Sequence, residues 1–356
     1  MPQAKPWPVF CQDQPSISMC STRSQLTIPG FLMMRSFACR FLLILLYVGV
    51  APLRAEPSAA DFATAIVKLD AVIAPGARTL PTLGSERSGS AVVIDASGLL
   101  LTVGYLVLEA EQVLITFADG TTAEAEIIVN DIATGLALLR TDLPAGTSSI
   151  VLGDSTQLVV DQDVVVLQHG GTGTAHVATV VSARDFSGSW EYHLDRAFYT
   201  VPATRSFSGA ALINRDAELV GIGSLLLSDV YSRSDSRSAS GNLFIPVEHL
   251  RKNFGQLLTG NTTAQNRPWL GVTLNETLPD LEIVRVAEDS PAATAGLQAD
   301  DAIIALNDVR VYKMADFYKA LWNAGVAGDT FELLIARDRN LRQIEVISAD
   351  RERWFR

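Results

Sequence analysis

Short apolar runs, each broken by turn residues, dominate the chain from about residue 88 to residue 250. Each run is only a few residues long, which favours strands over helices. Asp119-Gly120, directly after one run, is typical of a hairpin turn. Many short strands at close spacing favour a sandwich or barrel over a βαβ sheet. The expected strands are Ala91–Ile94, Leu99–Thr102, Val113–Phe117, Ile127–Val129, Val164–Leu167 and Leu219–Ile222.

The pattern changes on both sides of this region. Apolar residues three or four positions apart predict a helix over Ser58–Ala74, which Pro75 would end. Residues 255–267 are polar and rich in turn formers, and they predict a linker. Residues 268–350 predict a second domain, with strands near Leu281–Val286, Ala302–Leu306 and Phe331–Ala336 and a helix near Met314–Ala324.

Residues 1–55 predict an N-terminal extension and a signal peptide. Arg35 and Arg40 precede the apolar run Phe41–Ala51, and a basic start, an apolar stretch and a small residue at the cut describe a secretory signal. Cleavage near Ala55 would leave a secreted or periplasmic protein. The alternative is an uncleaved segment that anchors the chain, and only then would the protein contact a membrane. Residues 1–32 lack this pattern, so we expect translation to start near Met33.

Composition, charge and cysteine positions exclude several classes of protein and of site. The chain has 356 residues, 48% of them hydrophobic and 19% charged, which supports folded domains rather than disorder. The net charge of −11 argues against nucleic-acid binding. All three cysteines precede Ala55, so the exported part would have no disulfide, thiolate catalyst or cysteine-based zinc site. No cofactor motif occurs, and the four histidines lack metal-ligand spacing, so we expect neither a cofactor nor a metal.

Several motifs resemble the HtrA/Deg family of exported trypsin-like serine proteases that carry a PDZ domain. Their order and spacing along the chain carry the resemblance. The motifs are Gly89–Ile94, Asp95–Thr102, Val151–Ser155, Ser206–Leu212 and Phe244–Pro246. The resemblance implies a mainly β fold, with a two-β-barrel trypsin-like domain over 56–254 and an α+β PDZ domain over 268–350.

The catalytic positions depart from the family pattern. A serine nucleophile needs a histidine to take its proton and an aspartate to orient that histidine. By the resemblance, Ser208 holds the nucleophile position, Tyr105 the histidine position and Gly135 the aspartate position. A tyrosine with an ordinary pKa near 10 is a poor base at neutral pH. These replacements predict a pseudoprotease in which Ser208 is a remnant nucleophile.

An active enzyme remains the alternative. His169 lies in a loop that the resemblance places near the oxyanion side of the site, and it could act as a relocated base for Ser208. The oxyanion turn itself is altered, because Ala210 stands where the family has a glycine, and an alanine resists a glycine-only conformation. The sequence alone is therefore compatible with a pseudoprotease and with an active serine endopeptidase.

The second domain carries its own binding motif. Pro268-Trp269-Leu270-Gly271-Val272 resembles the PDZ loop whose backbone N–H groups bind a C-terminal carboxylate. Phe317 and Leu321, on the helix expected to face that loop, would line the groove or belong to the core. The sequence thus predicts a protein that binds polypeptides or C-terminal tails as scaffold, adaptor or quality-control factor. The resemblance adds a homotrimer, or co-assembly with an active paralogue, as possible assemblies.

Overall fold

The computed structural model describes residues 59–170, 175–231, 236–277 and 280–355. The described residues, from Ala59 onward, form one compact unit. The predicted signal peptide and the start near Met33 lie outside the described residues. Within the described ranges, no helix is both long and apolar enough to span a bilayer.

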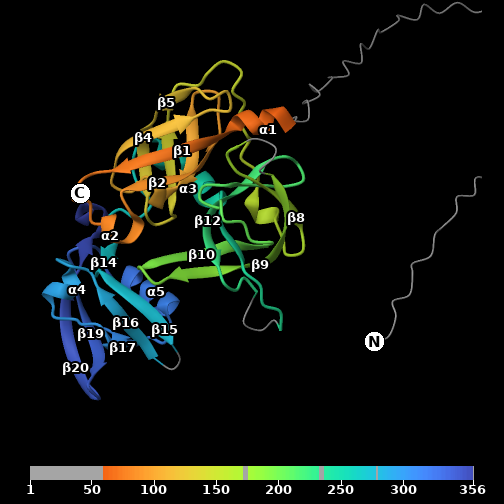
Figure 1. Cartoon of the computed structure of the whole chain (residues 1–356). Helices are drawn as coiled ribbons and strands as arrows, with labels where there is room; N and C mark the ends of the chain where they lie inside the picture. The colour runs from red at the N-terminus through yellow and green to blue at the C-terminus, as the bar shows by residue number, and fades with distance from the viewer. Residues whose placement is uncertain (1–58, 171–174, 232–235, 278–279, 356) are drawn as a thin grey trace, which may run out of the picture. The chain divides into compact units, whose positions relative to one another are not determined.

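A seven-stranded antiparallel sheet, in the order β5-β4-β1-β2-β3-β7-β6, forms the first half of the larger domain (Figure 1). Its strands are β1 (Ile66–Ile73), β2 (Glu86–Val93), β3 (Leu99–Val103), β4 (Ala110–Thr116), β5 (Thr122–Glu124), β6 (Glu126–Asp131) and β7 (Leu136–Arg140). Three short helices, α1 (Ala59–Ala65), α2 (Leu80–Leu83) and the 3₁₀ turn η1 (Gly104–Leu106), flank these strands. Leu99, Leu100 and Leu101 of β3 are all buried, which makes β3 a central strand of the core.

The second half is a closed barrel in the order β10-β13-β12-β11-β8-β9. Its elements are η2 (Ser155–Gln157), β8 (Asp163–Leu167), β9 (His176–Gly188), β10 (Tyr192–Val201), β11 (Ala211–Ile213), β12 (Leu219–Leu227), β13 (Gly241–Pro246) and α3 (Glu248–Leu258). Phe198 and Phe244 fill the barrel interior, and neither has exposed surface. Apolar residues of both halves join in one large core cluster, so the two sheets form one domain.

The helix predicted over Ser58–Ala74 is wrong for most of its length. Only Ala59–Ala65 is helical, and Ile66–Ile73 forms the strand β1. β1 pairs with β2 on one side and β4 on the other. The apolar residues counted as a helical stripe also fit the buried side of a strand, and β-branched residues favour the strand once partners exist on both edges.

The C-terminal domain is a six-stranded sheet with one long helix. Its elements are β14 (Pro268–Trp269), β15 (Val272–Thr277), β16 (Asp280–Val286), α4 (Pro291–Thr294), β17 (Ala302–Leu306), β18 (Val309–Arg310), α5 (Met314–Ala324), β19 (Thr330–Arg337), β20 (Asn340–Ile347), β21 (Ala349–Asp350) and α6 (Arg351–Trp354). β14 pairs with β21 outside that sheet. The helix α5 has the bounds that the sequence predicted. The predicted linker begins too early, because α3 continues to Leu258.

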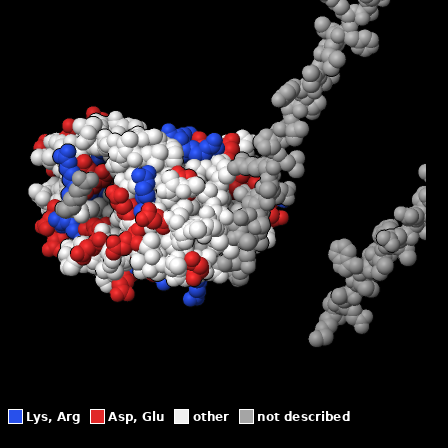
Figure 2. Space-filling model, turned by 90° about the horizontal axis from the view of Figure 1, so that it is seen from above, with Lys and Arg blue, Asp and Glu red and all other residues white. Residues whose placement is uncertain are grey.

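The predicted fold class is confirmed: the structure is mainly β, with curled sheets in the larger domain followed by the smaller sheet-and-helix domain. On the face drawn in Figure 2, acidic and basic side chains are scattered among uncharged ones.

Candidate active site and peptide groove

Ser208 and Tyr105 meet between the two halves of the larger domain. Ser208 precedes β11 of the barrel, and Tyr105 lies in η1 directly after β3 of the other sheet. Their hydroxyl oxygens are 2.8 Å apart and form a hydrogen bond. The tyrosine therefore stands in contact with the serine, as the base of a protease would.

Tyr105 has a second hydrogen-bond partner besides Ser208. The Tyr105 hydroxyl also lies 3.0 Å from the carbonyl oxygen of Ser224, which can only accept a hydrogen bond. A phenol has one proton, so when Tyr105 donates it to Ser224, the hydroxyl of Ser208 must donate to Tyr105. Burial raises the pKa of Tyr105 to about 12, although the hydrogen bond with Ser208 opposes that rise. At neutral pH Tyr105 is thus a neutral phenol that cannot remove the proton of Ser208.

The turn that carries Ser208 is held against the first sheet. The Ser90 amide donates to the Ser208 carbonyl at 2.9 Å. Gly209 adopts φ +73°, and a Cβ there would lie 1.9 Å from the Ser90 carbonyl oxygen. The glycine-only position of this turn is therefore Gly209, while Ala210 is buried with an ordinary φ. The expected conflict at Ala210 does not arise.

Gly135 lies directly before β7 in a left-handed conformation, with φ +76°. A Cβ at this position would lie 2.7 Å from the hydroxyl oxygen of Tyr192, closer than real Cβ contacts. Tyr192 is buried and donates to the Thr134 carbonyl at 2.7 Å, so it is fixed in place. A side chain introduced at position 135 would therefore collide with the Tyr192 hydroxyl.

His169 lies beside Ser90 rather than in hydrogen-bond contact with Ser208. Its Nδ1 atom is 3.3 Å from the Ser90 hydroxyl oxygen, and its backbone amide donates to the same oxygen at 3.1 Å. Burial, with Lys68 adding to it, lowers the pKa of His169. His169 is thus in the neutral form that a base requires, but its ring faces a neighbouring serine.

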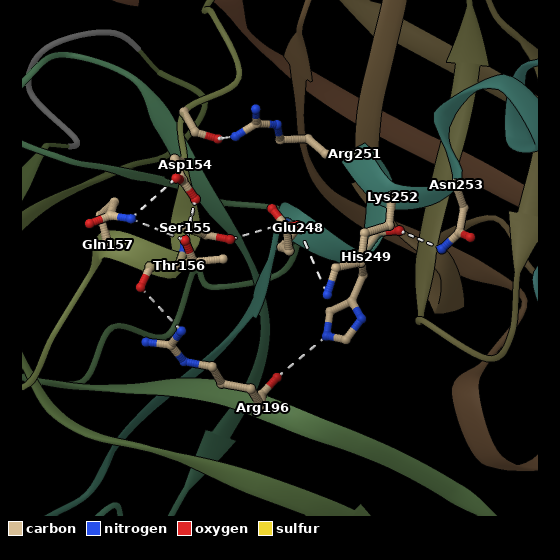
Figure 3. A network of polar contacts seen from close by, with 11 residues as sticks. Asp154, Ser155, Thr156, Gln157, Arg196, Glu248, His249, Arg251, Lys252 and Asn253 are labelled. Atoms are coloured by element: carbon tan, nitrogen blue, oxygen red, sulfur yellow. Dashed lines mark hydrogen bonds and ion pairs between the residues drawn. The ribbon is translucent and has the colours of Figure 1, made fainter.

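Several other polar contacts of this domain hold α3 and the segment after it in place. Asp131 has no exposed surface, and its carboxylate accepts from the amide and hydroxyl of Thr263, after α3. The amide of Glu248, which opens α3, donates to the Ser155 hydroxyl at 3.1 Å (Figure 3). His249, one residue further, contacts the Arg196 carbonyl at 3.5 Å (Figure 3). The motif Val151–Ser155 therefore connects α3 to the barrel through the hydrogen bond of Ser155.

The second site is the loop between β14 and β15. The backbone amides of Leu270, Gly271 and Val272 all donate to the carboxylate of Glu191, at 3.1, 2.6 and 3.0 Å. Gly271 has φ +90°, and a Cβ there would lie 2.3 Å from the Cβ of Ser290. Only glycine suits this position, and the conformation aims successive amides at one anion. The loop singled out from the sequence does bind a carboxylate, and that carboxylate is the chain's own.

The remaining predicted groove residues lie around this loop. Trp269 is 6% exposed and packs on Trp354 with ring centroids 4.6 Å apart. Phe317 and Leu321 of α5 are fully buried in the apolar core of this domain. Tyr318 was not anticipated, yet its hydroxyl donates to the Gly188 carbonyl at 2.8 Å. Glu191 was missed as well, because no local pattern marks a glutamate whose partners lie about 80 residues further along the chain.

The fold and these two sites define a trypsin-like peptidase domain joined to a PDZ domain. Residues 89–222 match the model of the trypsin-like peptidase domain, and residues 268–347 match that of the PDZ domain. The two matches contain the loops that carry Ser208 and Gly271 respectively.

The chain is similar to several curated proteins. The chain is 30% identical over 279 residues to a probable periplasmic serine endoprotease DegP-like of Pseudomonas fluorescens strain Pf-5, covering 74% of this chain and 56% of the relative. It is 27% identical to the protein of the same name from Ectopseudomonas mendocina, with the same coverage of 74% and 56%. The chain thus spans about half the length of the curated relatives it matches. These relatives and the two domain matches support the resemblance to the HtrA/Deg family.

Among solved structures, the HtrA-type protease AlgW with decapeptide aligns with a TM-score of 0.51 and 20% identity. The alignment covers 82% of this chain and 98% of the other. At this identity the likeness concerns the fold.

Proposed function

We propose that this chain is an HtrA/Deg-type pseudoprotease that binds polypeptides or C-terminal tails through its PDZ domain, as scaffold, adaptor or quality-control factor. The observation that carries the pseudoprotease assignment is the 2.8 Å contact between Ser208 and the neutral phenol of Tyr105. Losing the base of a serine protease costs on the order of 10⁶ in turnover. The filled space beside Gly135 adds a second loss, because an introduced base would lack its orienting carboxylate.

The proposed binding of peptides rests on the loop of Leu270, Gly271 and Val272. Three amides that converge on one carboxylate are the arrangement with which PDZ domains capture a chain terminus. A periplasmic site of action follows from the resemblance to relatives named as periplasmic proteins. Assembly as a homotrimer, or with an active paralogue, is part of this proposal. Mild crosslinking and pull-down from the native host would recover the paralogue if that assembly exists.

The second candidate is a serine endopeptidase in which His169 serves as base for Ser208. The observation in its favour is that His169 is neutral and bonds Ser90, whose amide donates to the Ser208 carbonyl. A change of the His169 rotamer would have to bring a ring nitrogen to Ser208.

Labelling with a fluorophosphonate probe, beside casein digestion, separates the two candidates. The pseudoprotease predicts no labelling above the background of Ser208→Ala. Labelling and digestion that disappear in both Ser208→Ala and His169→Ala would instead establish the endopeptidase.

A further inference from the structure

The turn between β9 and β10 contacts the PDZ domain. These two strands belong to the barrel, and the turn Gly188–Glu191 at their end reaches α5 and β15 (Figure 1). Glu191 is only 4% exposed although it is a glutamate. A buried carboxylate needs hydrogen-bond donors or positive charges nearby to offset its lost hydration. The contacts of Glu191 therefore indicate the role of the turn.

Two sets of contacts made by the turn resemble those that a bound peptide would make. The Glu191 carboxylate occupies the three amides of the carboxylate-binding loop. Two residues before Glu191, the carbonyl of Ser189 accepts from the Leu274 amide at 2.8 Å. Leu274 lies two residues after Val272 on β15, so the turn runs antiparallel to this strand. An extended peptide that adds to an exposed sheet edge also pairs through main-chain hydrogen bonds, and the bond between Ser189 and Leu274 is of this kind.

The helical wall of the groove also holds the turn. The Tyr318 hydroxyl on α5 donates to the Gly188 carbonyl at 2.8 Å and accepts from the Glu191 amide at 3.2 Å. Arg351 donates to the Glu191 carbonyl at 3.2 Å, and its charge lies close enough to oppose the desolvation of the carboxylate. The strand, the loop and the helix of the groove thus all contact one segment of the other domain.

We infer that Gly188–Glu191 is an intramolecular ligand that closes the PDZ groove, so that a peptide binds only by displacing it. This inference rests on the proposed peptide-binding function of the same groove. The side-chain carboxylate of Glu191 takes the place of a terminal carboxylate. The apparent dissociation constant of a peptide is then its intrinsic value divided by the open fraction.

The test uses the purified chain and a fluorescein-labelled peptide, Asp-Phe-Ser-Gly-Ser-Trp-Val, with a free C-terminus. It carries the sequence of the turn but ends in an aliphatic residue. We expect Glu191→Gln to bind this peptide about tenfold or more tightly than the unchanged chain does in fluorescence anisotropy. Tyr318→Phe, which keeps the ring and loses both hydrogen bonds, should tighten binding to a smaller degree. Glu111→Gln, at an exposed site, is the matched control and should leave the affinity unchanged.

Hydrogen exchange of the segment 268–274 provides a readout that needs no peptide. Closure predicts protected amides in the unchanged chain and faster exchange in Glu191→Gln. Faster exchange without peptide binding by any variant would uphold closure and remove the peptide-binding function. Equal affinity in all variants, with unchanged exchange of this segment, would overturn the closed groove. If Glu191→Gln fails to fold, Tyr318→Phe decides the question by the same two readouts.

Discussion

The hydroxyl oxygens of Tyr105 and Ser208 lie 2.8 Å apart, so the residue that we propose at the position of a catalytic base is in hydrogen-bond contact with the proposed nucleophile position. Burial of the phenol raises its pKa to about 12. Under the proposed function, the contact has the spacing of a serine–base pair, but a neutral phenol cannot take the proton of the serine.

Replacing Tyr105 with histidine is expected to leave peptidase activity far below that of an active HtrA protease. A histidine at position 105 could take the proton of Ser208, but no carboxylate at position 135 would hold its tautomer. The loss of that carboxylate costs about 10⁴ in turnover. Casein digestion by Tyr105→His, compared with an active HtrA protease, checks this. Activity within tenfold of that enzyme would contradict the account.

Gly135→Asp is expected to lower the free energy of unfolding by about 2–4 kcal/mol instead of completing a triad. The new Cβ would collide with the Tyr192 hydroxyl, and the backbone φ of +76° disfavours any side chain. Urea denaturation measures the change. Gly120→Asp is the matched control, because Gly120 has φ +84° but open space around its Cβ position. Its cost should be about 1 kcal/mol, and equal costs at both positions would argue against the collision with Tyr192.

Asp131→Ala is expected to cost about 2–4 kcal/mol of stability. The change leaves the amide and hydroxyl of Thr263 without their buried acceptor, and hydrogen bonds to a charged group are among the more costly to lose. The segment after α3 should also become a substrate for limited proteolysis. Asp142→Ala removes an exposed carboxylate and should change stability by less than about 0.5 kcal/mol. An unchanged urea midpoint for Asp131→Ala would show that Thr263 does not depend on it.

Stability at alkaline pH should depend on Tyr105. The pKa of Tyr105 is raised from 10 to about 12 in the folded chain, so its contribution is complete below pH 10 and is lost as the pH rises through 12. The difference in unfolding free energy between the unchanged chain and Tyr105→Phe should therefore shrink over this interval. Urea denaturation at pH 9, 10 and 11 tests it, within the pH range where both proteins fold. A difference that stays constant or grows with pH would contradict the raised pKa.

Much of the larger fold could be predicted because its signals are local. Short apolar runs and the Asp119-Gly120 turn predicted the β4–β5 hairpin and six of the thirteen strands that the structure describes in the larger domain. In the smaller domain, α5 has its predicted bounds. The failure at Ile66–Ile73 has a physical reason: a run of apolar residues fits a helical stripe or a strand equally well until its partners are known. Here β2 and β4 supply those partners. The linker was predicted to begin at residue 255 because the segment is polar and rich in turn formers, but α3 continues to Leu258 and buries Leu257.

The sequence by itself determined the residue types at both sites. Ser208 without a histidine or aspartate at the matching positions, and Gly271 within a carboxylate-binding loop, are readable from their own short motifs. Only the tertiary structure decided what fills the spaces around them. Tyr192 occupies the volume beside Gly135, and Glu191 occupies the amides of Leu270, Gly271 and Val272. These contacts join residues tens of positions apart in the chain. They form only when the barrel closes and the second domain packs against its β9–β10 turn, and no short-range propensity encodes that.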